Sequence, residues 1–249
     1  MSGHRPWSEV KHRKPGLLGR LPQRPPEKRY AISWAHEQLA APLPPPKYPI
    51  DVTHGLQDWG ILGNDRYGDC AVAGRYHLSL STALAASQPE PHFTDEQVIQ
   101  EYLTYTGGQD QGAVLADYLL WLYEQELILA FAPVDVSNIE HADALMAMFN
   151  GLYCGMSLTA DAPALFAEHQ PWTTANGESP VSSMGHCIVK VAADGETDKW
   201  VTWGAVQPST SEWTRSCLQE AWCIVTNEEQ LAAFEPSLLQ EIEALGGQG

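Results

Sequence analysis

Residues 63–70 read Gly-Asn-Asp-Arg-Tyr-Gly-Asp-Cys and lead directly into residues 71–86, a stretch rich in Ala and Leu that lacks proline. We therefore expect a helix whose N-terminus lies at Cys70. The backbone N–H groups and the dipole at a helix start favour an anion, which predicts a lowered pKa and a reactive thiolate for Cys70. Asn64, six residues earlier, can direct its amide toward the sulfur. With the backbone N–H of Cys70 it would form an oxyanion hole.

Two later stretches could complete a catalytic site. His186 stands at the head of an apolar run, Gly185-His186-Cys187-Ile188-Val189, and the next strand-like run reads Trp200-Val201-Thr202-Trp203-Gly204. This layout resembles that of papain-like cysteine peptidases. In that family a Gln lies six residues before the nucleophilic Cys, the base His leads a strand, and an Asn-Ser-Trp-Gly motif follows on the next strand. Asn64, Cys70, His186 and Trp203-Gly204 occupy the matching places.

A second resemblance runs from about Leu18 to Thr226. It is to a group of uncharacterised bacterial and phage proteins with an Asn-Asp-x-x-Gly-Asp-Cys motif and a late Val-Thr-Trp-Gly motif. The papain-like resemblance implies acyl transfer to a thiol, with Cys70 as nucleophile, His186 as acid and base, and Asn64 in the oxyanion hole. Trp203 would shield the histidine.

The sequence also departs from the papain-like pattern. Val201 stands where the family has the Asn that orients the imidazole, and Val cannot form that hydrogen bond. Thr202 and Asp198 are the candidates to take this role instead, although neither lies at the expected offset. Ala71 replaces the usual Trp after the cysteine, and the neighbouring Asp69 opposes thiolate formation unless it caps the helix or pairs with an arginine. Taken singly, Cys70 could be a small buried residue and His186 a core histidine.

Charge divides the chain into two parts. Residues 1–50 contain nine Lys/Arg, three Asp/Glu and ten of the 18 prolines, whereas residues 51–249 contain five Lys/Arg and 28 Asp/Glu. We expect a basic, extended N-terminal arm over 1–50 and an acidic domain over 51–249. The acidic domain should repel nucleic acid, because phosphate binding depends on Lys and Arg. Such an arm can be a disordered tail, a strap over its own domain or a tether on a neighbouring subunit, and composition does not choose between these. The arm could bind protein partners, and a short helix near residues 32–39 is possible.

Helical patterns precede strand patterns in the domain. Helices are expected over 71–86, 94–105, 113–125, 138–149 and 227–245, and strands over 152–158, 187–191, 200–203 and 221–226. Thr94 with Gln97 is typical of a capping box. This order favours an α+β, papain-like fold in which a helical layer is followed by an antiparallel sheet.

Several classes of function are not indicated. The five cysteines match no disulfide framework, and the nine histidines show no zinc-site spacing, so we expect no metal and no cofactor. No apolar run is long enough for a membrane span, and no secretory signal is evident. We expect a cytoplasmic protein, or a virion component if the chain is phage-encoded.

Two functions remain open at this point. The first is a papain-like cysteine hydrolase, a peptidase or amidase acting on a peptide or amide substrate, in either an active or a degenerate form. It requires an accessible cleft with Cys70 and His186 in contact. The second is a non-catalytic virion or capsid-associated protein that reuses the fold in a multi-copy assembly and tethers its neighbours through residues 1–50. It requires a blocked or filled cleft.

Overall fold

One antiparallel sheet and a set of helices make up the structure, a computed structural model that describes residues 14–22, 45–227 and 230 of the 249-residue chain. In this part of the chain the strand order is β2-β7-β3-β4-β5-β6, and β1 pairs with β4. The strands are β1 Ile50–Asp51, β2 Ala130–Val134, β3 Leu152–Thr159, β4 Pro180–Ala193, β5 Thr197–Thr202, β6 Ala205–Thr210 and β7 Leu218–Val225. The helices are α2 Cys70–Ala85, α3 Asp95–Tyr105, α4 Leu115–Glu124, α5 Ile139–Phe149, α6 Ala162–Ala167 and α7 Ser211–Cys217.

The expected helices within the described residues are confirmed. Helix α2 begins at Cys70, as its proline-free sequence predicts, and Asp69 is its N-cap residue. Helix α3 carries the predicted capping box between Thr94 and Gln97, which satisfies backbone N–H groups that the first helical turn leaves free. The expected helices near residues 32–39 and over 227–245 lie outside the described residues, Asn227 and Gln230 excepted.

Three of the described strands were not predicted: the two-residue β1, which pairs with β4, and strands β2 and β6, which lie at the two edges of the sheet. Strand β2 contains Pro133 and β6 contains Pro208, and these strands end the β2-β7-β3-β4-β5-β6 order. Proline cannot donate to a ladder hydrogen bond, so strands that contain it are confined to edges. The same prolines argue against a strand at the sequence level, so these two strands were not predicted from the alternation of apolar and polar residues. The predicted strand at 187–191 is the centre of the longer β4.

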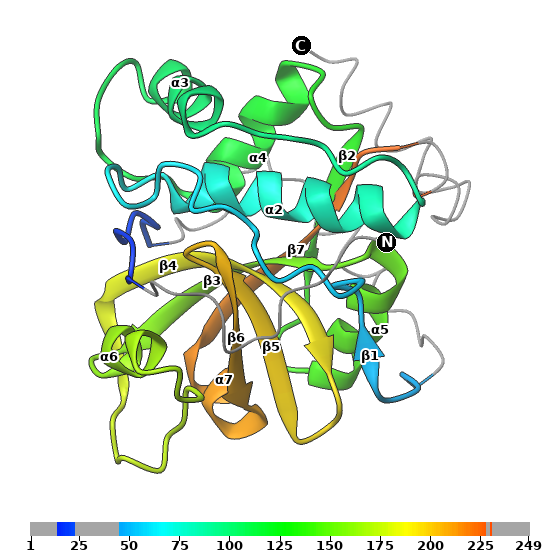
Figure 1. Cartoon of the computed structure of the whole chain (residues 1–249), viewed down its shortest axis with the longest axis vertical. Helices are drawn as coiled ribbons and strands as arrows, with labels where there is room; N and C mark the ends of the chain where they lie inside the picture. Colours follow the sequence, from blue (N-terminus) through cyan, green and yellow to red (C-terminus); the bar gives the residue numbers. More distant parts are fainter. Residues whose placement is uncertain (1–13, 23–44, 228–229, 231–249) are drawn as a thin grey trace.

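The start of α2 is fixed against the sheet. The Tyr153 hydroxyl on β3 donates a hydrogen bond of 2.8 Å to the carbonyl of Ala71. A Cβ at Gly74 would lie 3.2 Å from the sulfur of Cys187 on β4, so glycine allows the helix to approach closely. In Figure 1, α2, α3 and α4 lie together above strands β3–β6, and α6 and α7 lie below. Residue 70 therefore sits at the boundary between the helices and the sheet.

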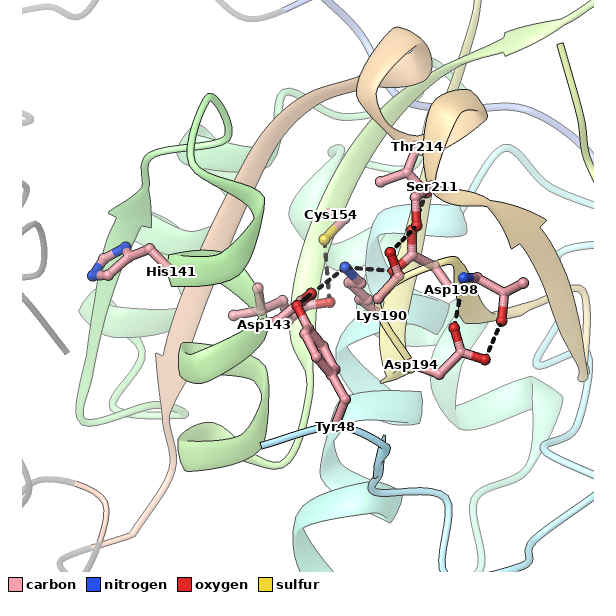
Figure 2. A network of polar contacts seen from close by, with 12 residues as sticks. Tyr48, His141, Asp143, Cys154, Lys190, Asp194, Asp198, Ser211 and Thr214 are labelled. Carbon is pink, nitrogen blue, oxygen red and sulfur yellow. Dashed lines mark hydrogen bonds and ion pairs between the residues drawn. The ribbon is translucent and has the colours of Figure 1, made fainter. Parts of the chain in front are cut away.

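A buried charge cluster joins β4 to its neighbours (Figure 2). Lys190 on β4 pairs with Asp143 of α5 and, at 2.8 Å, with Asp198 of β5. The hydroxyl of Tyr48 donates to Asp143 and that of Thr214 donates to Asp198. All three charged side chains are buried, so each depends on the others for its charge to be tolerated. This network, four residues beyond His186, fixes the strand that carries the histidine.

None of the helices among the described residues is long and apolar enough to cross a membrane.

Candidate active site

The thiol of Cys70 is closed off from solvent. Cys70 is 1% exposed, and backbone groups of Cys187 and Gly19 lie against its sulfur. Burial raises the pKa of the Cys70 thiol to about 11, and the nearby Asp69 carboxylate adds to this, although the backbone groups oppose it. The predicted low pKa is wrong for this closed arrangement. Desolvation of the thiolate outweighs the favourable field at the start of α2.

His186 is held by the strand that follows it. Its Nε2 lies 2.8 Å from the Thr202 hydroxyl, and its ring stacks on Trp203 with the centroids 4.8 Å apart. Thr202, one residue after Val201, thus makes the hydrogen bond to the imidazole that Val201 cannot make. Asp198, the other candidate, belongs instead to the Lys190 network. Burial, with a smaller contribution from His77, lowers the pKa of His186 to about 3, so the imidazole is neutral.

The second nitrogen of His186 is free for chemistry. Among the described residues, Nδ1 has no hydrogen-bond partner although it is buried. The Thr202 hydroxyl fixes the orientation of the ring, but it is neutral. It therefore does not stabilise a protonated His186 as an aspartate would. In this arrangement no hydrogen bond between described residues joins the ring to Cys70. The predicted nucleophile and base are therefore both neutral and not engaged with each other.

Residues 14–22, termed here the covering segment, account for this closure. Its backbone bonds to three separate parts of the domain: Leu17 N–H to Asn64 O at 2.6 Å, Arg20 N–H to Gly185 O at 3.3 Å, and Ala113 N–H to Gly19 O at 2.8 Å. In Figure 1 the segment is the dark-blue trace beside the start of α2 and above β4.

The covering segment also occupies the predicted oxyanion hole. The Asn64 amide donates hydrogen bonds of 3.1 Å to the carbonyl oxygens of Leu17 and Tyr67. A Cβ at Gly16 would lie 2.5 Å from both Asn64 O and the Trp203 ring, so the chain passes between these residues. A peptide carbonyl thus accepts a hydrogen bond from the side chain that was predicted to bind one.

Two glycines permit this close passage. A Cβ at Gly19 would lie 1.7 Å from the Gly68 carbonyl oxygen, a distance that real atoms do not adopt. Sequence reasoning left open whether the arm straps its own domain, but it did not single out residues 14–22, although Gly16 and Gly19 interrupt a basic, proline-rich stretch and were a usable signal. It also missed Glu220, whose charge stands alone in the apolar run of β7.

Asp69 does not neutralise its charge in either expected way. Its side chain makes no capping hydrogen bond, and the guanidinium groups of Arg66 and Arg75 lie near Asp95 and Glu101 instead. Asp69 is fully buried. Burial raises the pKa of the Asp69 carboxyl to about 7, and neither of its oxygens has a hydrogen-bond partner among the described residues.

Replacing Asp69 by Asn is therefore expected to stabilise the protein above neutral pH. The unfolded chain releases this proton near pH 4, and the folded chain holds it to about pH 7. The wild-type free energy of unfolding should therefore fall as pH rises through this window. The difference of about three pKa units corresponds to at most about 4 kcal/mol. Urea unfolding at pH 5 and pH 8 measures it. Asp65→Asn, which changes an exposed residue of the same loop, is the control. A free energy of unfolding that falls between pH 5 and pH 8 by the same amount in Asp69→Asn as in the wild type would contradict the expectation.

Comparisons with known proteins agree on the fold. No protein-family model matches the chain, and no curated protein matches it. Among solved structures, xylellain, a cysteine protease from Xylella fastidiosa, is similar with a TM-score of 0.59 and 16% identity, over 88% of this chain and 99% of that one. The digestive procathepsin L 3 of Tenebrio molitor larval midgut is similar with a TM-score of 0.54 and 8% identity, over 86% and 76%. The chain has a papain-like α+β fold.

Proposed function

We propose that this chain is a cysteine peptidase whose active site is closed by its own covering segment. One observation carries the proposal: the site holds an extended peptide. The carbonyl of Leu17 accepts from the Asn64 amide, and the backbone of Gly19 lies against the Cys70 sulfur. An extended substrate peptide could use the same backbone partners once the segment leaves, because these bonds do not depend on side-chain identity.

The reaction would begin when water reaches the uncovered site. Exposure removes the burial that now keeps both groups neutral, so the thiol proton can pass to Nδ1 of His186. The thiolate then attacks the carbonyl carbon of the scissile amide, and the Asn64 amide and the Cys70 N–H stabilise the resulting oxyanion. The C–N bond breaks as His186 protonates the leaving amine. Water, deprotonated by His186, hydrolyses the thioester and restores the thiol.

The test is peptide hydrolysis by a full-length chain that cannot close. Gly19→Val prevents docking through its clash with Gly68, and Gly16→Val does so independently at Asn64. Both variants should cleave a quenched fluorescent peptide library, whereas the Gly19→Val/Cys70→Ala double variant should not. A further Thr202→Val change should lower kcat and alter the pH profile, and Thr202→Ser should restore both. An exposed, alkylatable Cys70 without any peptide cleavage would overturn the proposal.

A second candidate has its own support. A non-catalytic scaffold, for example a component of a multi-copy virion or capsid assembly, requires a filled cleft, and the covering segment fills it. The neutral Cys70 and His186 suit that role as well. The same experiment separates the two functions, because a scaffold remains inactive after Gly19→Val even when its thiol has become accessible.

A further inference from the structure

Glu220 carries a buried charge that the proposed chemistry does not use. It lies on β7 with 5% of its surface exposed. Its Oε1 accepts hydrogen bonds from Nε of Arg20 at 2.9 Å and from Nη2 at 2.7 Å. Its Oε2 accepts one from the indole N–H of Trp222 at 3.0 Å. A carboxylate in such surroundings requires a cation, because an unpaired buried charge is costly.

That cation comes from the covering segment and not from the domain. Arg20 is the only ion-pair partner of Glu220 among the described residues. Its side chain is buried too, and Nη1 lies 3.5 Å from the carbonyl oxygen of Met156. Removal of the segment would leave Glu220 with the Trp222 indole as its remaining partner among these contacts. The domain therefore presents an acidic site that is complete only when an arginine occupies it.

The slot for the guanidinium is shaped by a missing side chain. Gly155 on β3 stands directly opposite Glu220 in the pairing of β3 with β7. A Cβ at Gly155 would lie 2.5 Å from Nε of Arg20 and 2.7 Å from Cγ of Glu220. The glycine thus leaves the space that the guanidinium fills. Arginine suits this slot better than lysine, because its planar fork bonds the carboxylate through two nitrogens at once.

The residue whose side chain fills the slot directly follows the residue that lies against the Cys70 sulfur. Gly19 lies against Cys70, Arg20 follows directly, and the Arg20 N–H bonds to the carbonyl of Gly185, the residue before His186. A side chain in the slot therefore belongs to a peptide that crosses the thiol.

We propose that Glu220 is a specificity-determining residue that selects an arginine side chain of the substrate, and that Arg20 occupies its place in the closed form. This inference rests on the proposed peptidase function. It assigns the slot formed by Glu220, Gly155, Trp222 and the Met156 carbonyl to the guanidinium of a peptide bound across Cys70.

The test uses the full-length Gly19→Val/Arg20→Ala variant, in which the site is uncovered and the slot is empty. Fluorogenic peptides would carry Arg, Lys, citrulline or Leu at each position near the cleaved bond. At one position kcat/KM for Arg should exceed that for citrulline, which has the same shape without the charge, by at least about 30-fold. Adding Glu220→Gln should reduce this ratio to below about 3-fold. Glu212→Gln, on the exposed face of α7, should leave it unchanged.

Binding gives a second reading that does not depend on catalysis. Fluorescein-labelled peptides with the sequence of residues 14–22, carrying Arg or citrulline at position 20, are titrated into the Gly19→Val/Arg20→Ala/Cys70→Ala variant. The Arg peptide should bind at least about 30-fold more tightly, and Gly155→Ala should weaken it while the carboxylate stays intact. Arginine-dependent binding to this variant, without cleavage by the variant that retains Cys70, refutes the peptidase and leaves Glu220 as part of an arginine-binding slot only. Cleavage of Arg and citrulline peptides at equal rates refutes this inference alone, and so does equal binding of the two labelled peptides.

Discussion

Gly19→Val is expected to raise the rate at which iodoacetamide alkylates Cys70 at pH 7 by at least about 100-fold. In the closed form burial raises the pKa of this thiol to about 11, so only about one molecule in ten thousand carries the thiolate at pH 7. The pKa of a thiol freed from the covering segment returns to about 8.5 or below, so several per cent of the molecules carry the thiolate at pH 7. Steric exposure of the sulfur adds to this gain. Peptide mass spectrometry of the alkylated chain measures the rate at each cysteine.

Internal and external controls accompany this measurement. The other four cysteines are all buried and should label as slowly in the variant as in the wild type. Leu21→Ala changes an exposed side chain of the same segment and should leave Cys70 protected. In the uncovered variant, His186→Ala should move the pH profile of alkylation upward if a thiolate–imidazolium pair forms. A Cys70 that stays slow in both Gly19→Val and Gly16→Val would refute closure by the covering segment.

Lys190→Met is expected to lower the free energy of unfolding by about 3–5 kcal/mol at neutral pH, the cost of breaking a buried ion pair on one side. The substitution keeps most of the length of the unbranched side chain and removes its charge. Asp143 and Asp198 would then be two buried carboxylates without the cation that lies between them in Figure 2. Chemical denaturation followed by tryptophan fluorescence measures the loss.

The partner substitutions separate charge from packing. Adding Asp143→Asn and Asp198→Asn to Lys190→Met removes both stranded charges and should recover at least half of the lost free energy. Lys199→Met, on the exposed ion pair with Asp51, should change stability by less than about 1 kcal/mol. A loss in Lys190→Met no larger than that in Lys199→Met would show that the cluster carries little of the stability.

Helices α2 to α5 could be predicted from the sequence because local signals specify them, whereas the short helices α6 and α7 were not expected. The proline-free run after Cys70 and the Thr94 capping box determine where α2 and α3 begin, and the structure has both starts as expected. The α+β order also follows from the switch between helical and alternating patterns. Strands β2 and β6 could not be found in this way, because a proline in each conceals an edge position that only the sheet as a whole defines.

The residues of the candidate site could be named from the sequence, but the pKa of Cys70 and the closure of the site could not. The resemblance to papain-like peptidases, together with the predicted helix start at Cys70, predicted Asn64, Cys70, His186 and the Thr202-Trp203 pair as site residues. The covering segment contacts Asn64, Cys70 and Trp203. The pKa of Cys70, however, depends on which part of the chain lies over it. The contact between Gly19 and Gly68 spans nearly fifty residues of sequence, and no local pattern encodes such a contact.

A tether makes the closure of the site independent of dilution. The covering segment belongs to the same chain as the thiol that it protects, so its local concentration at the site does not fall when the protein is diluted. A free peptide in solution would have to reach a comparable concentration before it competed on equal terms. Cutting the chain between residue 22 and residue 45 would abolish that advantage at once. The segment could then diffuse away, and a reversible equilibrium within one molecule would become a permanent change.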